Sequence, residues 1–261
     1  MGRHAITLDF HNTLVACDAW FDLEVRHLVS AFLQWDANER GDTVDPRLLS
    51  AADASYRRIR RAIHLHGHEL PAERSVATVL SELGVSVPFD RIAAGVEILM
   101  RSALAELQPM PGAIETVEAL ANTGIPVAVV SSAVYHPFLI WALDQLGMRD
   151  AIQEVVTSAS AGYYKSRPEI YWHALDLLEV DPGRSAHVGD SLRFDVGGAR
   201  RAGMRAVWLS NGAAPGPDDA QPDLVLSTLS GSASAIVEVA TSPTSSNGHV
   251  VPAAVPTASR R

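Results

Sequence analysis

Cysteine and long apolar runs are almost absent from this 261-residue chain. Cys17 is the only cysteine, which excludes an internal disulfide and a metal cluster held by cysteines. No apolar run approaches the ~18 residues that suggest a membrane span. Positive charge is also in deficit, because 21 Lys and Arg stand against 30 Asp and Glu. An acidic chain of this kind disfavours nucleic acid and anionic membranes as partners, and we expect a cytoplasmic protein, monomeric or homodimeric.

The remaining composition is that of an ordinary globular protein, with 47% hydrophobic and 20% charged residues. Residues 18–107 have the apolar spacing of helices, and Asp45-Pro46, Pro71 and Pro88 mark helix starts. From Pro111 onward, short strands alternate with helices of 10–12 residues. This alternation predicts a doubly wound, mostly parallel α/β sheet.

The pattern divides the chain into three parts. We expect an α/β core from residues 1–15 and 109–240, interrupted by an all-helical insertion at 16–108. The core should contain strands at 5–9, 125–131, 154–157, 186–190, 205–209 and 223–226, with helices at 112–122, 135–146, 168–178 and 194–202. Residues 241–261 lack aromatic residues and periodicity, which predicts a disordered tail.

Polar side chains follow four of the predicted strands and connections. They are Asp9, Ser131 with Ser132, Lys165, and Asp190 with Asp195. In a doubly wound sheet, ligands bind outside the carboxyl ends of the strands, so these side chains can converge on one crevice. Carboxylates, a hydroxyl and an ammonium group suit phosphoryl transfer with Mg²⁺, a hard ion that prefers oxygen ligands.

In this order, the segments resemble the haloacid dehalogenase superfamily, in its phosphatase branch with a helical cap of the C1 type. The resemblance covers about residues 5–230. It rests on the segments Leu8-Asp9-Phe10-His11-Asn12-Thr13-Leu14, Val129-Val130-Ser131-Ser132, Lys165-Ser166-Arg167-Pro168 and Val188-Gly189-Asp190-Ser191-Leu192-Arg193-Phe194-Asp195. It implies a Rossmann-like core and a Mg²⁺-dependent hydrolase of a small phosphorylated metabolite.

The resemblance also implies a role for each matching residue. Asp9 would be the nucleophile that takes the phosphoryl group as an aspartyl phosphate. Asp9 and Asp190 would hold Mg²⁺ together with the backbone carbonyl of His11, and Asp195 would orient a metal-bound water or Lys165. Lys165 would offset the negative charge, and Ser131 would hydrogen-bond a phosphoryl oxygen. Asn12 and Ser132 are further candidates for phosphate binding.

His11 departs from the family pattern, because phosphatases of this family usually have a second aspartate at this position. The aspartate protonates the leaving alcohol and later activates water, and an imidazole can perform both steps. Three readings therefore stay open. The first is a phosphatase with His11 as general acid and base; the second is a dehalogenase or a phosphonate-cleaving enzyme on the same fold. The third is a catalytically weak member that binds a ligand or a protein partner.

The helical insertion holds two further candidate features. Arg57, Arg58, Arg60 and Arg61 form a basic cluster on one predicted helix, and from it we select Arg57 and Arg61 as substrate-binding candidates. A solvated helix face paired with acidic residues is the alternative for this cluster. His64, His66 and His68 alternate around Gly67, which we expect to end the helix, but no cysteine or carboxylate spacing supports a zinc site there.

Overall fold

A six-stranded parallel sheet forms the centre of the computed structural model, which describes residues 2–214, 216 and 220–242. Its strand order is β5-β4-β1-β6-β7-β8, and every neighbouring pair is parallel. The strands are β1 (Ala5–Leu8), β4 (Val127–Ser131), β5 (Glu154–Thr157), β6 (Ser185–Gly189), β7 (Arg205–Leu209) and β8 (Leu224–Leu226). The predicted doubly wound sheet is thus confirmed, with strand ends within two residues of their expected positions.

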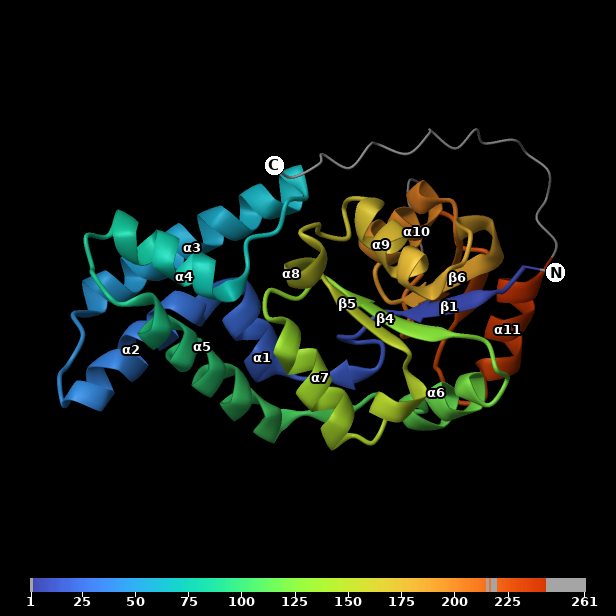
Figure 1. Cartoon of the computed structure of the whole chain (residues 1–261), viewed down its shortest axis with the longest axis horizontal. Helices are drawn as coiled ribbons and strands as arrows, with labels where there is room; N and C mark the ends of the chain where they lie inside the picture. Colours follow the sequence, from blue (N-terminus) through green and yellow to red (C-terminus); the bar gives the residue numbers. More distant parts are fainter. Residues whose placement is uncertain (1, 215, 217–219, 243–261) are drawn as a thin grey trace, which may run out of the picture.

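Helices cover both faces of the sheet (Figure 1). One face carries α6 (Ala113–Ala121), α7 (His136–Gln145) and α11 (Ala233–Thr241), whose apolar side chains join those of β1 and β6 in one core. The other face carries α9 (Glu169–Leu178) and α10 (Gly197–Ala202), packed in a second core. Burial on both faces explains why the strands read as continuous apolar runs.

The predicted helix at 194–202 is two elements: a π-helical segment, η5 (Leu192–Val196), precedes α10. Two short helices were not expected, α8 (Ser158–Ala161) and α11. The α11 segment contains Ser, Thr and the β-branched residues Ile and Val, which have weak helix preference, and its burial against the sheet stabilises it instead. Short 3₁₀ turns at Leu104–Glu106, Arg149–Ala151 and Pro182–Arg184 complete the connections.

The segment between β1 and α6 is helical, as predicted. It contains α1 (Asp18–Asp22), the π-helical η1 (Leu23–His27), α2 (Leu28–Arg40), α3 (Pro46–His66), α4 (Ala72–Glu82) and α5 (Phe89–Ala103). It enters through β2 (Val15–Ala16) and leaves through β3 (Gln108–Pro109), which pair antiparallel. The chain therefore crosses between the sheet and this helical insertion through two short strands that lie side by side.

The helix ends of the insertion follow the sequence signals. Asp45 caps α3 by accepting a hydrogen bond from the Arg47 backbone, with Pro46 in the first turn. Gly67 ends α3 in the left-handed conformation. The apolar core of the insertion is continuous with that of one sheet face, so the two parts share a core. No helix among the described residues is both long enough and apolar enough to cross a membrane.

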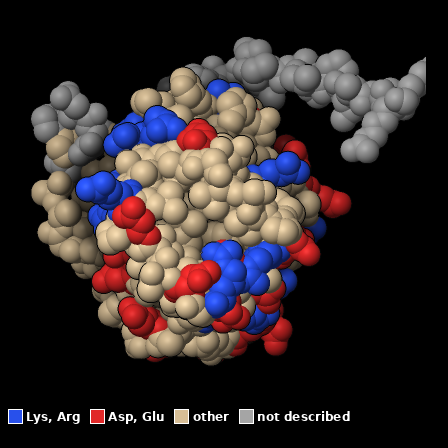
Figure 2. Space-filling view, turned by 90° about the vertical axis from the view of Figure 1, so that its left-hand side faces the viewer, with Lys and Arg blue, Asp and Glu red and all other residues tan. Residues whose placement is uncertain are grey.

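The surface of the helical insertion carries charges of both signs. Figure 2 shows Lys and Arg side chains interspersed with Asp and Glu over the outer side of the insertion. Mixed charge of this kind is typical of a solvated surface. The tail predicted to be disordered, 241–261, lies outside the described residues from position 243 onward.

Candidate active site

Three of the predicted site residues form one buried cluster at the carboxyl edge of the sheet. Asp9 directly follows β1, and its backbone N–H donates to the Val188 carbonyl of β6 at 2.8 Å. The Lys165 ammonium donates to a carboxylate oxygen of Asp9 and, at 2.6 Å, to one of Asp195. All three residues are at most 7% exposed. The convergence expected from the strand ends is therefore present for this set.

Asp190 brings a third carboxylate to the same place. Asp9, Asp190 and Asp195 each offer one oxygen, and these three oxygens lie within 4.8 Å of one another. Gly189 permits this approach, because a Cβ at that position would overlap the Asp195 carboxyl. An all-oxygen donor set around one lysine fits a hard divalent cation such as Mg²⁺.

The cluster holds more negative charge than Lys165 can offset. Burial raises the pKa of Asp9 to about 7, with Asp195 and Asp190 adding to the rise and Lys165 opposing it. Burial and Asp195 likewise raise the pKa of Asp190 to about 6. Carboxyls whose negative charge is this costly gain most from an additional cation, which supports a metal site at Asp9 and Asp190.

Asp195 is held differently from the other two acids. Its burial would raise its pKa, but Lys165 and His187 hold that pKa well below the usual range. One oxygen contacts Lys165 and, at 3.2 Å, the His187 Nε2, while the other accepts from the Ser191 backbone at 2.8 Å. The contact with Lys165 is one that the orienting role predicted for Asp195 requires, and the role itself stays a prediction.

His187 and Thr13 are site residues that the sequence reasoning missed. His187 lies on β6, hydrogen-bonds Thr7 at 2.8 Å through Nδ1 and faces Asp195 through Nε2; burial lowers its pKa to about 4. Thr13 donates from its hydroxyl to the second Asp9 oxygen at 3.2 Å. A histidine inside an otherwise apolar central strand was the available signal for His187.

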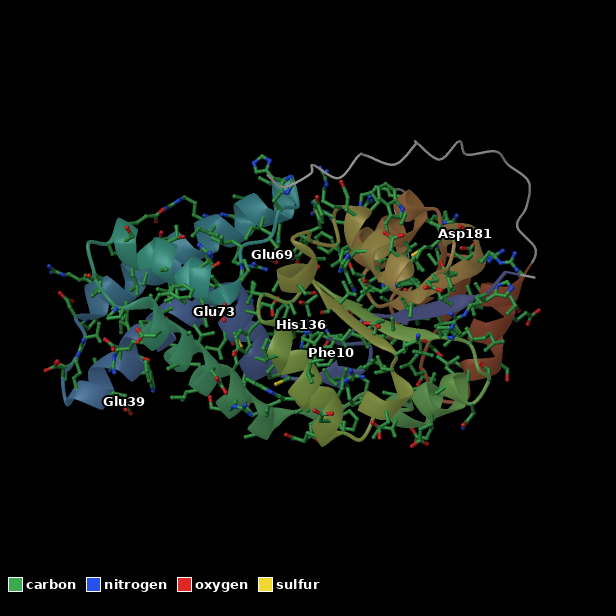
Figure 3. The ribbon with its side chains drawn as sticks, in the orientation of Figure 1. Phe10, Glu39, Glu69, Glu73, His136 and Asp181 are labelled. Atoms are coloured by element: carbon green, nitrogen blue, oxygen red, sulfur yellow. The ribbon has the colours of Figure 1, made fainter. Side chains whose placement is uncertain are left out.

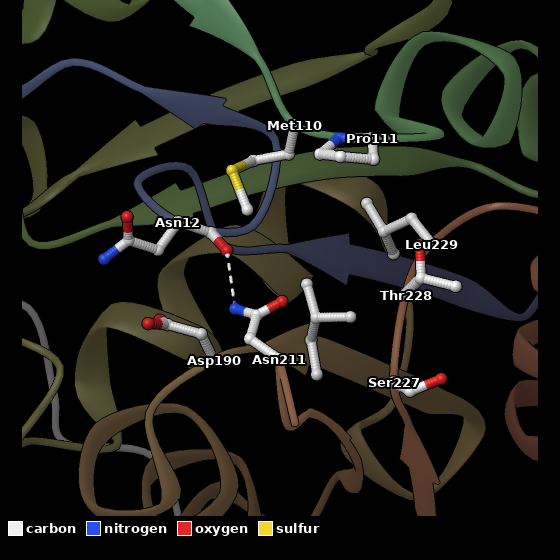
Figure 4. A pocket seen from close by; sticks show the side chains of 9 residues that line it. Asn12, Met110, Pro111, Asp190, Asn211, Ser227, Thr228 and Leu229 are labelled. Atoms are coloured by element: carbon white, nitrogen blue, oxygen red, sulfur yellow. Dashed lines mark hydrogen bonds between the residues drawn. The ribbon is translucent and has the colours of Figure 1, made fainter. Parts of the chain in front are cut away.

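The turn after β1 places Asn12 beside Asp190. Asn12 has a φ of 61°, its backbone N–H donates to the Val15 carbonyl at 2.7 Å, and its side chain acts to lower the pKa of the Asp190 carboxyl. Its carbonyl accepts from the Asn211 side chain at 3.4 Å, the contact dashed in Figure 4. Asn211 also has a positive φ, 46°. Asparagine tolerates this conformation better than most residues, which explains the residue type at both positions.

A cavity of about 490 Å³ opens on this side of the site. Figure 4 shows Met110, Pro111 and Leu229 on one side of it and Asn12 with Asp190 on the other. The cavity therefore reaches the candidate metal ligand Asp190 from the side of β7 and β8.

His11 lies on the insertion side of the turn. Its ring stacks on Phe21 at a centroid distance of 4.6 Å and packs edge-on against Trp20 at 5.5 Å. Burial lowers the pKa of His11, which favours the neutral imidazole. Its Nε2 is buried and has no hydrogen-bond partner among the described residues. The acid–base role of His11 stays a prediction.

The remaining candidates are two serines at the end of β4 and two arginines on the surface of α3. Ser131 ends β4 and is 3% exposed, and the Ser132 hydroxyl accepts from the Lys165 backbone at 3.1 Å, so Ser132 positions the lysine. Arg57 and Arg61 are exposed on α3, and their role in substrate binding stays a prediction. The buried member of the basic cluster is Arg60, which was not selected.

The chain is similar in sequence to known proteins of one family. A family model described as haloacid dehalogenase-like hydrolase matches residues 4–203. A glyceraldehyde 3-phosphate phosphatase from Methanopyrus kandleri is 29% identical over 204 residues, covering 76% of this chain and 80% of that protein. A bovine protein named haloacid dehalogenase-like hydrolase domain-containing protein 3 is 35% identical over 115 residues, which are 44% of this chain and only 43% of that protein.

Solved structures share the fold. A 2-haloacid dehalogenase from Pseudomonas syringae pv. Tomato superposes with a TM-score of 0.67 at 22% identity, covering 90% of this chain and 98% of that one. A phosphatase from Thermococcus onnurineus gives a TM-score of 0.57 at 23% identity, covering 87% and 94%. Because enzymes of both kinds share this fold, the fold alone does not select the reaction.

Proposed function

The chain belongs to the haloacid dehalogenase-like hydrolase family and is an enzyme, and from this premise we propose that it hydrolyses a small phosphomonoester with the help of Mg²⁺. The observation that carries the proposal is the cluster of Asp9, Lys165 and Asp195, all buried, with the partly exposed Asp190 beside them. Its surplus negative charge favours a divalent cation, and a phosphorylated substrate is the kind of ligand that such a cation binds. The phosphatase relative from Methanopyrus kandleri supports the same choice.

In the proposed reaction Asp9 attacks the phosphorus. A bond forms between an Asp9 oxygen and phosphorus, and the bond to the leaving oxygen breaks. The leaving oxygen takes a proton from the imidazolium form of His11, which the negative charge of a bound phosphate would favour over the neutral form. A water then attacks the aspartyl phosphate, gives a proton back to His11 and releases phosphate and free Asp9. Lys165 and the Ser131 hydroxyl would stabilise the negative charge on the phosphoryl oxygens.

The metal would be held by Asp9, Asp190 and the carbonyl of His11. When bound, Mg²⁺ supplies positive charge between the carboxylate and the phosphate, two groups that otherwise repel each other. Asp195 would keep Lys165 in place through their contact.

We also propose that the helical insertion, residues 16–108, is a cap domain that covers the site. Its first helix supplies Trp20 and Phe21, which pack on His11. Covering the site would exclude bulk water while Asp9 is attacking and would let insertion residues select the substrate. Arg57 and Arg61 belong to this part of the proposal as candidate contacts to an acidic group of the substrate.

One competing function rests on His11. A family member with an altered acid–base residue could bind a phosphorylated ligand without rapid turnover, and dehalogenation on the same fold is a further alternative. Asp190 argues against dehalogenation, because that branch of the family needs no metal and typically lacks this carboxylate.

An assay of the full chain with an aryl phosphate separates the three. Hydrolysis that requires Mg²⁺ and stops on chelation supports the phosphatase. Halide release from a 2-haloacid without Mg²⁺ would favour dehalogenation. Absence of turnover together with measurable phosphate binding would favour the binding role.

A further inference from the structure

A second buried charged cluster lies where the helical insertion meets the α/β part. Arg60 of α3 pairs with Glu69 at 2.6 Å, and its other terminal nitrogen lies 3.9 Å from Glu24 of η1. The three side chains are 3%, 0% and 4% exposed, respectively. A cluster of this kind is costly to bury, so its position in the fold calls for an explanation.

Both acids of the cluster reach across to the α/β part. A Glu24 oxygen accepts a hydrogen bond from the Val134 backbone at 3.2 Å, in the loop after β4. The second Glu69 oxygen accepts from the Ser158 hydroxyl at 2.6 Å, at the start of α8 after β5. Figure 3 places Glu69 at this junction between α3 and the α/β part. Arg60 thus holds two carboxylates of the insertion against two adjacent loops at the carboxyl edge of the sheet.

The same junction touches the peptide that carries Lys165. The Gly67 carbonyl, at the end of α3, accepts from the Tyr164 backbone at 2.9 Å, and Arg60 lies 5.9 Å from the Tyr164 ring centre. The next residue is Lys165, whose backbone is fixed by Ser132 and whose ammonium contacts Asp9. Contacts made by the insertion are therefore one residue from the active-site lysine.

Nearby ion pairs of the insertion do not share this arrangement. Arg58 lies on the same helix, but it is exposed and pairs with Glu82 of α4, inside the insertion. The pair of Arg91 with Asp36 also stays within the insertion. Arg60 differs in that its partners are also bonded to the α/β part.

We propose that Arg60 is a positioning residue, which docks the helical insertion on the loops after β4 and β5 and thereby fixes the peptide before Lys165. The effect on turnover rests on the proposed phosphatase function, whereas the docking itself does not. Without the guanidinium, the Glu69 carboxylate is left buried without a positive partner, and the junction opens.

The test compares Arg60→Met with Arg58→Met, the matched control on the same helix, in the full chain. Hydrogen exchange of backbone amides is measured by mass spectrometry. In Arg60→Met we expect exchange at 66–72, 132–137 and 158–165 to rise by about tenfold or more, with β1 and β6 unchanged. In Arg58→Met all of these segments should exchange as in the wild type.

Kinetics give a second, independent readout. With an aryl phosphate, Arg60→Met should lower kcat by about tenfold while the Mg²⁺ dissociation constant stays within about twofold, and Arg60→Lys should recover part of the kcat. If the wild type hydrolyses no phosphate ester, the proposed function fails, but the exchange result still decides the docking role.

Three results would overturn the proposal: unchanged exchange in Arg60→Met, the same rise in Arg58→Met, or a uniform rise that includes β1 and β6. If Arg60→Met does not fold, Ser158→Ala takes its place. That variant removes one bond on the α/β side and should speed exchange only at 66–72 and 158–165. Wild-type exchange in both segments would contradict the docking role.

Discussion

Two buried charged clusters in this molecule are built from similar parts but are balanced differently. Around Lys165, three carboxylates share one ammonium, and burial raises the pKa of Asp9 to about 7 and that of Asp190 to about 6. Around Arg60, two carboxylates share one guanidinium, and burial together with Glu69 raises the pKa of Glu24 to about 8. With every carboxyl ionised, the Lys165 cluster would carry two negative charges in excess of its ammonium, and the Arg60 cluster would carry one in excess of its guanidinium.

The two clusters differ in what can neutralise their excess negative charge. Asp190 borders a cavity and is partly exposed, so a cation can reach the Lys165 cluster from solvent. The side chains of the Arg60 cluster are at most 4% exposed, and a proton on Glu24 makes the cluster neutral. Similar charged groups therefore suit metal-assisted chemistry in one place and docking of two parts of the chain in the other.

The largest expected effect is the loss of hydrolysis when the Lys165 cluster is altered at Asp9. Asp9→Asn keeps the size of the side chain but removes the attacking oxygen charge, so we expect hydrolysis of an aryl phosphate to fall by on the order of 10³-fold or more. Initial rates at saturating Mg²⁺ measure the loss. Glu82→Gln, which alters an exposed acid of the insertion, should stay within about twofold of wild type. Full activity in Asp9→Asn would disprove the aspartyl-phosphate mechanism.

The next effect concerns His11, in the turn after β1. His11→Ala removes the ring that packs on Trp20 and Phe21 but keeps the backbone carbonyl. We expect turnover to fall by about 10²–10⁴-fold, because the leaving oxygen loses its proton donor, while Mg²⁺ affinity changes little. Rates and calorimetric Mg²⁺ titrations measure the two quantities. Wild-type turnover in His11→Ala would show that the imidazole is not the acid–base group.

How much of this could be read from the sequence differs between the clusters. Asp9, Lys165, Asp190 and Asp195 were predictable, because parallel strands bring their carboxyl ends to one edge wherever the connections run. Arg60 was harder, since it depends on the rotation of a helix rather than on strand order. The buried positions Ala52, Tyr56, Arg60 and Ile63 do share helical spacing, and that signal favours Arg60 over Arg57 and Arg61.

Other features that the sequence did not predict have the same kind of cause. Glu24 follows Trp20 by one helical turn, and both are buried, but its partners Val134 and Arg60 are far away in the sequence. Such contacts depend on how the insertion rests on the sheet, which no local pattern encodes. The α11 helix was missed for a related reason, because tertiary packing rather than local preference forms it.

A third prediction sharpens the comparison through metal rescue. Lys165→Met and Arg60→Met each leave buried carboxylates without their cation, and we expect each to lower the free energy of unfolding by about 3–5 kcal/mol. Mg²⁺ should restore a large part of the loss in Lys165→Met, because Asp9 and Asp190 can bind it, and almost none in Arg60→Met. Urea unfolding with and without Mg²⁺ measures this. Equal recovery in both variants would contradict the distinction between the clusters.

The fourth prediction concerns the proton assigned to Glu24. Its pKa is about 8 in the folded protein against an ordinary value of 4.5, so between these pH values the folded state holds a proton that the unfolded state has lost. The stability from Glu24 is therefore fully present below about pH 4.5 and declines as pH rises to about 8, by at most about 1.4 kcal/mol per pH unit. Glu24→Gln has no such proton, and its amide still offers an oxygen to Val134.

Urea unfolding of wild type and Glu24→Gln from pH 5 to pH 9 isolates this contribution, because the other titrating groups are common to both proteins. The wild type should lose stability relative to the variant up to about pH 8, and the difference should then stay constant. Glu82→Gln serves as the control: the Ser55 hydroxyl and Arg58 lower the pKa of Glu82, so its difference from wild type should not change across this range. Parallel curves for wild type and Glu24→Gln would mean that Glu24 is ionised in the folded protein. Arg60 would then carry two charged partners, and the Arg60 cluster would resemble the Lys165 cluster in its unmet negative charge.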